Sequence, residues 1–262
     1  MNEPLLEIDR VTKRFGQVVI AEDVSLAVSA GDTVGIVGPN GAGKTSLFGL
    51  ISGDLAPDGG QVRFGGRTVT KLDAASRCRL GVGRTYQVPR PFGDMTVFEN
   101  LLVAAQQGAG LRRRASYTAA VDALQRAGIS DQANVPAERL GLLQRKRLEL
   151  ARALATQPTL LLLDEVAGGL TDPEVAQLVE IVRGVNADGT AVIWIEHVVR
   201  ALTAVVGRLI CLSGGQFVGD GEPSAVLANP AVREVFLGTE VTAALAGGSL
   251  DAAPEDGERS EP

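Results

Sequence analysis

The most informative stretch of this chain is an eight-residue loop, Gly38-Pro39-Asn40-Gly41-Ala42-Gly43-Lys44-Thr45. It fits the pattern Gly-x-x-x-x-Gly-Lys-Ser/Thr. A predicted strand, residues 33–37, precedes the loop, and a predicted helix follows from about Lys44. This order aims backbone N–H groups and the positive end of a helix at a phosphate. A glycine-rich turn without a ligand is the alternative, but the context of the match argues against it. We therefore expect the chain to bind a nucleoside triphosphate.

The residue types around the loop suggest individual contacts. We expect the Lys44 ammonium to reach the β- and γ-phosphates and the Thr45 hydroxyl to bind Mg²⁺. Residues 5–11 and 18–28 are predicted to form two antiparallel strands, joined by a turn at residues 13–16. Phe15 lies in that turn, where an exposed ring would stack on adenine. A phenylalanine that anchors the turn from the core is the alternative.

Four further polar residues follow predicted strands. Gln87 ends a strand that Pro89 interrupts. Asp164 and Glu165 close a run of four leucines, which is typical of a strand buried on both faces. His197, the only histidine, follows a third apolar strand. Because the carboxyl ends of parallel strands meet at one edge of a sheet, we expect these side chains to converge on the nucleotide.

The chemistry of phosphoryl transfer suggests a role for each of them. Asp164 is expected to hold Mg²⁺ opposite Thr45, and Glu165 to activate the attacking water as general base. His197 is expected to contact the γ-phosphate, and Gln87 to contact Mg²⁺ and water. A carboxylate pair at the end of a buried strand is costly without such a task.

The distribution of charge bears on the partners. The formal net charge is −6, and residues 243–262 hold five acids and one base, so the rest of the chain carries −2. A nearly neutral body lacks the basic footprint of nucleic-acid binding, so no nucleic acid is expected. No apolar run approaches the roughly 18 residues of a membrane span, and no signal-like segment is present. The sequence thus predicts a cytoplasmic chain.

The order of these motifs resembles the ATP-binding cassette family of transport ATPases, over roughly residues 5–240. The matching positions are Phe15 at the aromatic adenine position, residues 38–45 as Walker A, Gln87 as the Q-loop, residues 160–165 as Walker B, residues 169–171 as the D-loop and His197 as the switch histidine. More narrowly, the stretches 47–53, 84–87, 95–101 and 195–197 are similar to the ATP-binding subunits of branched-chain amino acid importers. A lipopolysaccharide-export ATPase would look similar.

The resemblance implies an α/β fold: a P-loop NTPase core of the RecA-like type, with an N-terminal antiparallel β subdomain and an inserted helical subdomain. Residues 1–87 would form the first part of the core, residues 88–156 the helical subdomain, and residues 157–242 the second part of the core. Residues 243–262 are predicted to be a disordered acidic tail. The implied cofactors are ATP and Mg²⁺.

One motif departs from the family. The family signature is Leu-Ser-Gly-Gly-Gln, whereas this chain has Leu140-Gly141-Leu142-Leu143-Gln144. Gly141 lacks the serine hydroxyl that contacts the γ-phosphate, and Leu143 replaces a glycine whose backbone approaches the phosphates. Val166 also replaces the proline usual after the catalytic glutamate. Each nucleotide in this family lies between the phosphate loop of one subunit and the signature of the other. We therefore expect a heterodimer with a second cassette whose signature is intact.

The function implied is that of an ATP-hydrolysing subunit that powers import of branched-chain amino acids or a related small polar solute. Permease subunits would hold it at the cytoplasmic face of the membrane, with membrane contact only through them. A regulatory or structural cassette with little hydrolysis is the alternative, which the altered signature favours while Glu165 and His197 oppose it. A DNA-repair or translation ATPase is disfavoured by the single cassette and the absence of heptads. A GTP switch is disfavoured because no Asn-Lys-x-Asp motif appears.

Overall fold

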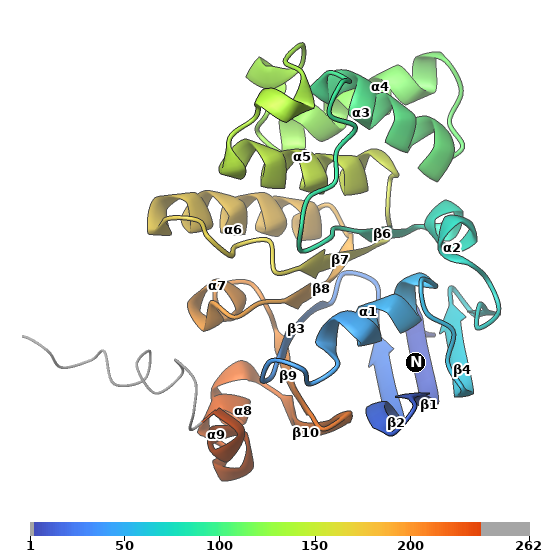
Figure 1. Cartoon of the computed structure of the whole chain (residues 1–262), viewed down its shortest axis with the longest axis vertical. Helices are drawn as coiled ribbons and strands as arrows, with labels where there is room; N and C mark the ends of the chain where they lie inside the picture. The colour runs from blue at the N-terminus through green and yellow to red at the C-terminus, as the bar shows by residue number, and fades with distance from the viewer. Residues whose placement is uncertain (1–2, 237–262) are drawn as a thin grey trace, which may run out of the picture.

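The structure, a computed structural model, describes residues 3–236 and contains two β-sheets (Figure 1). An antiparallel sheet has the strand order β2-β1-β4-β5. Its strands are β1 (Leu6–Phe15), β2 (Val18–Val28), β4 (Gly59–Phe64) and β5 (Arg67–Thr68). The expected tail, residues 243–262, lies outside the described residues.

The second sheet carries the residues that were expected to bind nucleotide. Its order is β10-β9-β3-β8-β7-β6, and within the described range only β10 runs antiparallel to its neighbour. The strands are β3 (Thr33–Val37), β6 (Val82–Arg84), β7 (Leu160–Asp164), β8 (Ala191–Ile195), β9 (Arg208–Ser213) and β10 (Gln216–Gly221).

Helices cover this second sheet on both faces. They are α1 (Lys44–Ser52), α2 (Ala74–Leu80), α3 (Val97–Val103), α4 (Arg114–Arg126), α5 (Leu142–Ala155), α6 (Asp172–Ala187), α7 (Val199–Thr203), α8 (Pro223–Ala228) and α9 (Pro230–Phe236). A π-helical turn, Ala104–Gly108, continues α3. None of the helices within residues 3–236 is long and apolar enough to cross a membrane.

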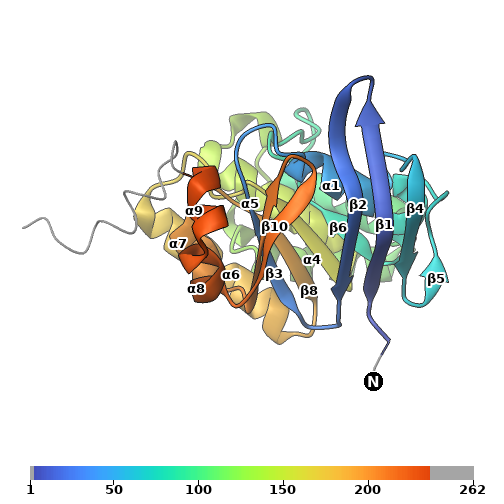
Figure 2. The same ribbon diagram turned by 90° about the horizontal axis from the view of Figure 1, so that it is seen from below.

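The layers are visible in two views. In Figure 1 the group α3, α4 and α5 lies above β6, β7 and β8, and α1 lies between that sheet and the antiparallel one. Figure 2 shows the antiparallel strands side by side at one end of the molecule and α8 and α9 against β10 at the other. The helices α3 to α5 fall within residues 88–156, the expected helical subdomain; the exact division of the chain stays a prediction.

The leucine run of β7 is buried on both faces, as the sequence predicted. Leu161 and Leu163 belong to the core under the helical group, whereas Leu160 and Leu162 belong to the core that contains α1 and the antiparallel sheet. A strand with a core on each side needs apolar residues at every position, not at every second one. The strand thus delivers Asp164 to the edge of the sheet from a fully apolar interior.

Two strand ends differ from the expectation. β1 continues through Phe15, so the turn lies at Gly16-Gln17 and not at residues 13–16. Lys13 pairs with Ala21 in the ladder to β2, and its ammonium forms an ion pair with Asp58 at 2.7 Å. β6 ends at Arg84 and not at Gln87.

The early end of β6 is explained by a contact with β7. The Asp164 N–H donates to the hydroxyl of Thr85 at 3.1 Å and not to a backbone carbonyl, so a side chain ends the ladder between β6 and β7. The chain then leaves the sheet as a loop that carries Gln87, three residues beyond the strand.

A buried arginine that the sequence analysis did not identify forms hydrogen bonds with the carbonyl groups at the C-terminal end of α1. Arg77 on α2 is only 1% exposed. Its guanidinium donates to the carbonyls of Leu50 (2.7 Å) and Ile51 (2.8 Å) at the end of α1, and to those of Thr70 and Leu72 (both 3.1 Å). Burial lowers the pKa of Arg77. The side chain therefore provides donors for carbonyls that a helix end leaves unpaired.

Replacing Arg77 with methionine should destabilise the fold. Four carbonyl groups, two of them buried, would lose a charged donor, and we expect the free energy of unfolding to fall by about 3 kcal/mol. Thermal or urea denaturation of the full chain measures this loss. Arg79→Met on the same helix is the matched control, because Arg79 is exposed and its loss should cost at most about 0.5 kcal/mol. Equal stability of the two variants would contradict the structural role of Arg77.

Candidate functional site

The loop between β3 and α1 is shaped by glycines that no other residue can replace without strain. Gly38 has φ 154° and Gly43 has φ 98°. A Cβ at Gly38 would lie 2.1 Å from the carbonyl oxygen of Leu212, and one at Gly43 would lie 2.6 Å from that of Ile20. Both approaches are shorter than a real contact, so the loop is packed by its backbone against β9 and β2.

Lys44 lies inside this loop and is only 6% exposed. Its ammonium donates to the carbonyl oxygens of Gly38 at 2.8 Å and Pro39 at 2.9 Å. Burial lowers the pKa of Lys44, and the nearby carboxylates of Glu165 and Asp164 partly oppose this. The loop thus places a buried cation at the start of α1, where the helix N-terminus also attracts anions.

Asp164 and Thr45 lie side by side, as the sequence predicted. The Thr45 hydroxyl is 3.5 Å from Asp164 Oδ1, and Asp164 is 1% exposed. Burial raises the pKa of Asp164, and the adjacent Arg84 guanidinium opposes that shift. A hydroxyl and a carboxylate beside a phosphate-binding loop form the oxygen donor set that Mg²⁺ prefers, so the residues present fit this ion.

Arg84 is a member of this site that the sequence reading did not identify. Its guanidinium is 3.3 Å from Asp164 and 2.9 Å from Asp54, and its side chain is 9% exposed. It also lies over the ring of Tyr86, at 5.0 Å from the ring centroid. The sequence does contain a signal for Arg84. It is a basic residue at the end of a short apolar strand, and the neighbouring strand ends in acidic residues.

Three of the predicted residues meet at one point. Glu165 Oε1 lies 2.7 Å from His197 Nε2, and Glu165 Oε2 accepts a hydrogen bond from the Gln87 amide. They come from the ends of β7 and β8 and from the loop after β6, so the expected convergence at the carboxyl edge is present. Gln87 contacts Glu165 and not the Thr45–Asp164 pair; its contact with Mg²⁺ stays a prediction.

The backbone of Glu165 is held in an uncommon conformation. Its φ is +49°, in the left-handed region that non-glycine residues seldom adopt. The Glu165 N–H donates to the carbonyl of Ile195 at 2.9 Å. This backbone conformation directs the Glu165 side chain, which is 15% exposed, toward His197.

Phe15 lies at the end of β1, next to the hairpin turn. Its side chain is 51% exposed, so it is not the core residue that was the alternative. The Lys13 ammonium is 5.2 Å from the centroid of its ring. An exposed aromatic face at this hairpin is free to stack on a base, and that role stays a prediction.

The altered signature lies at the start of α5. Gly141 is the N-cap, and no side chain provides the cap hydrogen bond. Leu142, in the first turn, is 51% exposed. Where the family has a hydroxyl and two glycines, this helix end therefore presents a glycine and aliphatic side chains.

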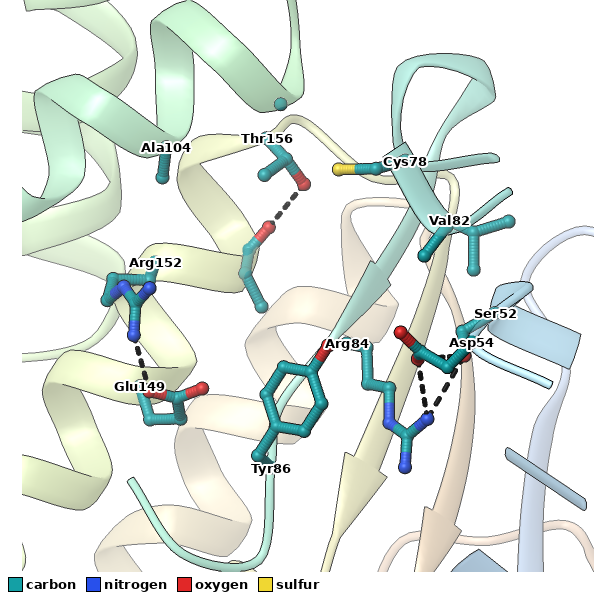
Figure 3. Close-up of a pocket in the computed structure, with 13 residues that line it drawn as sticks. Ser52, Asp54, Cys78, Val82, Arg84, Tyr86, Ala104, Glu149, Arg152 and Thr156 are labelled. Atoms are coloured by element: carbon teal, nitrogen blue, oxygen red, sulfur yellow. Dashed lines mark hydrogen bonds and ion pairs between the residues drawn. The ribbon is translucent and has the colours of Figure 1, made fainter. Parts of the chain in front are cut away.

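A cavity of about 220 Å³ lies beside Arg84, which forms part of its lining (Figure 3). Tyr86, Arg84 and Asp54 lie on one side of it, and Glu149 and Arg152 of α5 lie on the other. Glu149 and Arg152 form an ion pair at 2.9 Å, and Arg152 also donates to the carbonyl of Arg90. Burial raises the pKa of Glu149. The loop that carries Gln87 thus forms part of the wall of a pocket against α5.

Comparison with known proteins gives consistent matches. The family pattern described as "ABC transporter" matches residues 21–168. The chain is 35% identical over 253 residues to the high-affinity branched-chain amino acid transport ATP-binding protein LivG of Salmonella typhimurium, covering 91% of this chain and 99% of LivG. It is 34% identical to BraF of Pseudomonas aeruginosa, whose name describes the same role, with the same coverage.

A solved structure agrees with these sequence matches. The ADP conformation of an ATP-binding cassette of an ABC transporter superposes with a TM-score of 0.83 at 28% identity, covering 91% of this chain and all of that one.

Proposed function

This chain belongs to the ABC transporter family as an ATP-binding subunit, and we propose that it hydrolyses ATP at Glu165 to power import of branched-chain amino acids or a related small polar solute. The observation that carries the proposal is the contact of Glu165 with both His197 and Gln87 beside the buried Lys44 and Asp164. The similarity to LivG and BraF over nearly the whole of each relative supports the cargo class.

In the proposed reaction the phosphate loop binds the triphosphate through Lys44 and its backbone N–H groups, and Phe15 stacks on the adenine. Thr45 and Asp164 would hold Mg²⁺, which would supply positive charge against the phosphates. Glu165 accepts a proton from the attacking water. His197 and Gln87 hold the two carboxylate oxygens of Glu165 by hydrogen bonds. In this proposal His197 also contacts the γ-phosphate and Gln87 contacts the water.

Subunits of this family partner with transmembrane permease components. We propose that a permease loop docks at the cavity beside Tyr86, which would hold this chain at the cytoplasmic face of the membrane. The segment after Gln87 supports this, because Val88, Phe92 and Met95 are apolar and exposed there. These exposed apolar side chains follow Gln87, which contacts Glu165, and exposed apolar side chains of this kind are typical of a surface that a partner covers.

We further propose that the second ATP-binding subunit differs from this chain. A homodimer would place Gly141 and Leu143 over both nucleotides, and each site would lose charge-assisted contacts worth roughly 1.5–3 kcal/mol. With a partner whose signature is intact, the phosphate loop and Glu165 of this chain would form a strong site. The partner's phosphate loop would face the altered signature and form a weak one.

The test compares this chain alone with the chain coexpressed with candidate permease and cassette subunits. We expect co-purification of the complex, little ATP turnover by the isolated chain, and turnover in the complex that depends on Glu165 of this chain. The catalytic glutamate of each cassette is replaced in turn to assign the active site. Full activity of the isolated chain, or dependence on the partner's glutamate alone, would contradict the asymmetric arrangement.

The altered signature also favours a second candidate, a cassette that binds nucleotide and regulates the partner with little hydrolysis of its own. It predicts that Glu165→Gln leaves turnover of the complex unchanged, while Lys44→Ala changes the partner's activity. The same series of variants therefore separates the two functions.

A further inference from the structure

Glu196, the residue after β8, is a buried carboxylate to which the site described above assigns no role. It is 1% exposed. Its Oε1 accepts a hydrogen bond from the backbone N–H of Ala167 at 2.5 Å, and its Oε2 accepts one from the backbone N–H of His197 at 3.0 Å. One side chain therefore binds the segment after Glu165 and the segment that carries His197.

These two segments hold the reacting pair. The Glu165 carboxylate must stay 2.7 Å from His197 Nε2 although the Glu165 backbone is in the left-handed region, which is strained for a residue with a side chain. Such a conformation persists only where its surroundings fix it. The backbone of Glu165 adds one bond of its own between the two segments, from its N–H to the Ile195 carbonyl at 2.9 Å.

Lys146 of α5 supplies the countercharge. It is 7% exposed, and its ammonium donates to the carbonyl oxygen of Glu165 at 3.2 Å. Burial raises the pKa of Glu196; hydrogen bonds from the backbone N–H groups of Ala167, His197 and Val198 oppose that shift, and the charge of Lys146 adds to them. Lys146 lies in the second turn of the helix that begins with the altered signature, so α5 is tied directly to the backbone of Glu165.

We propose that Glu196 is a positioning residue for hydrolysis: it fixes the distance between Glu165 and His197, and Lys146 connects this arrangement to α5. The proposal rests on the proposed role of Glu165 in hydrolysis. It implies that a displacement of α5, whose first turn would face the partner's nucleotide, changes the alignment of Glu165 in this chain's own site.

The first test is kinetic and uses the assembled transporter. Glu196→Gln keeps the size of the side chain but places an amide N–H₂ against backbone donors. We expect kcat to fall about 10–100-fold, as for other residues that orient a reacting group, with KM for ATP changed less than about threefold. Glu174→Gln is the matched control. Glu174 also accepts a backbone N–H in this region, that of Thr171, but it does not contact the His197 segment.

The second test detects changes in the arrangement of Glu165 and His197 and does not depend on ATP turnover. Because His197 is the only histidine, its imidazole gives a single set of NMR signals in the untagged full chain. We expect Glu196→Gln and Lys146→Met to move the imidazole resonance in the same direction as Glu165→Ala, and Glu174→Gln to leave it in place. Lys146→Met also keeps the test valid if Glu196→Gln does not fold.

The outcomes separate the two proposals. If Glu165→Gln leaves turnover unchanged, the proposed function is wrong, and the imidazole signal still shows whether Glu196 sets the geometry. If the signal is the same in wild type, Glu196→Gln and Lys146→Met, the positioning role is overturned. A wild-type kcat in Glu196→Gln would overturn it as well.

Discussion

Exchanging Glu165 for glutamine will lower ATP turnover of the assembled transporter by roughly 10²–10⁴-fold, the range that a general base contributes, while ATP still binds. The amide keeps the size of the side chain and its place beside His197 and Gln87. It cannot take a proton from water, so only the chemical step should change. Binding of ATP and phosphate release by the complex are measured on the same preparation.

A matched control is Glu180→Gln on α6, where the carboxylate pairs with Arg183 at the surface. We expect wild-type turnover from it, since an exposed pair contributes little. Unchanged turnover in Glu165→Gln would contradict the proposed function and favour the regulatory cassette. If that variant no longer binds ATP, Glu165 contributes to binding of the substrate and not to the chemical step.

Replacing Lys44 with alanine will abolish tight ATP binding. The ammonium is held by the carbonyls of Gly38 and Pro39, inside the curve of the phosphate loop. Its loss removes charge-assisted contacts worth about 3 kcal/mol in all, which weakens the Kd for ATP by at least roughly a hundredfold. Titration calorimetry with ATP measures the change.

Lys71→Ala is the control for loss of a positive charge, because Lys71 is exposed and lies away from the loop in the turn before α2. Its Kd for ATP should equal that of the wild type. Thermal denaturation of both variants separates lost binding from a disordered loop. Tight binding by a folded Lys44→Ala variant would exclude the assigned contact with phosphate.

The sequence predicted those elements whose physical cause is local. β3 and α1 flank the phosphate loop as expected because the glycines, the apolar run before them and the helix start are contiguous. Thr96 and Glu99 form a capping box at the start of α3, a motif that can be recognised from sequence because both halves lie within four residues. The convergence of Asp164, Glu165 and His197 followed from one topological rule for parallel strands.

The features that were missed depend on contacts between distant segments. Arg77 and Glu196 are charged, and charged residues in a sequence are ordinarily assigned to the surface. Their burial is possible only because carbonyls of α1 meet Arg77 and the Ala167 N–H meets Glu196. The end of β6 was misplaced for the same reason, because the Thr85 hydroxyl takes the N–H of Asp164, 79 residues away.

The left-handed backbone of Glu165 has a consequence for protein engineering. Glycine, or asparagine to a lesser degree, would adopt φ +49° with less strain than glutamate does. A design procedure that optimised this chain for thermal stability alone would therefore tend to remove the residue on which turnover is proposed to depend. Any attempt to make this transporter subunit more heat-resistant must hold position 165 fixed and seek its gains in the two hydrophobic cores instead.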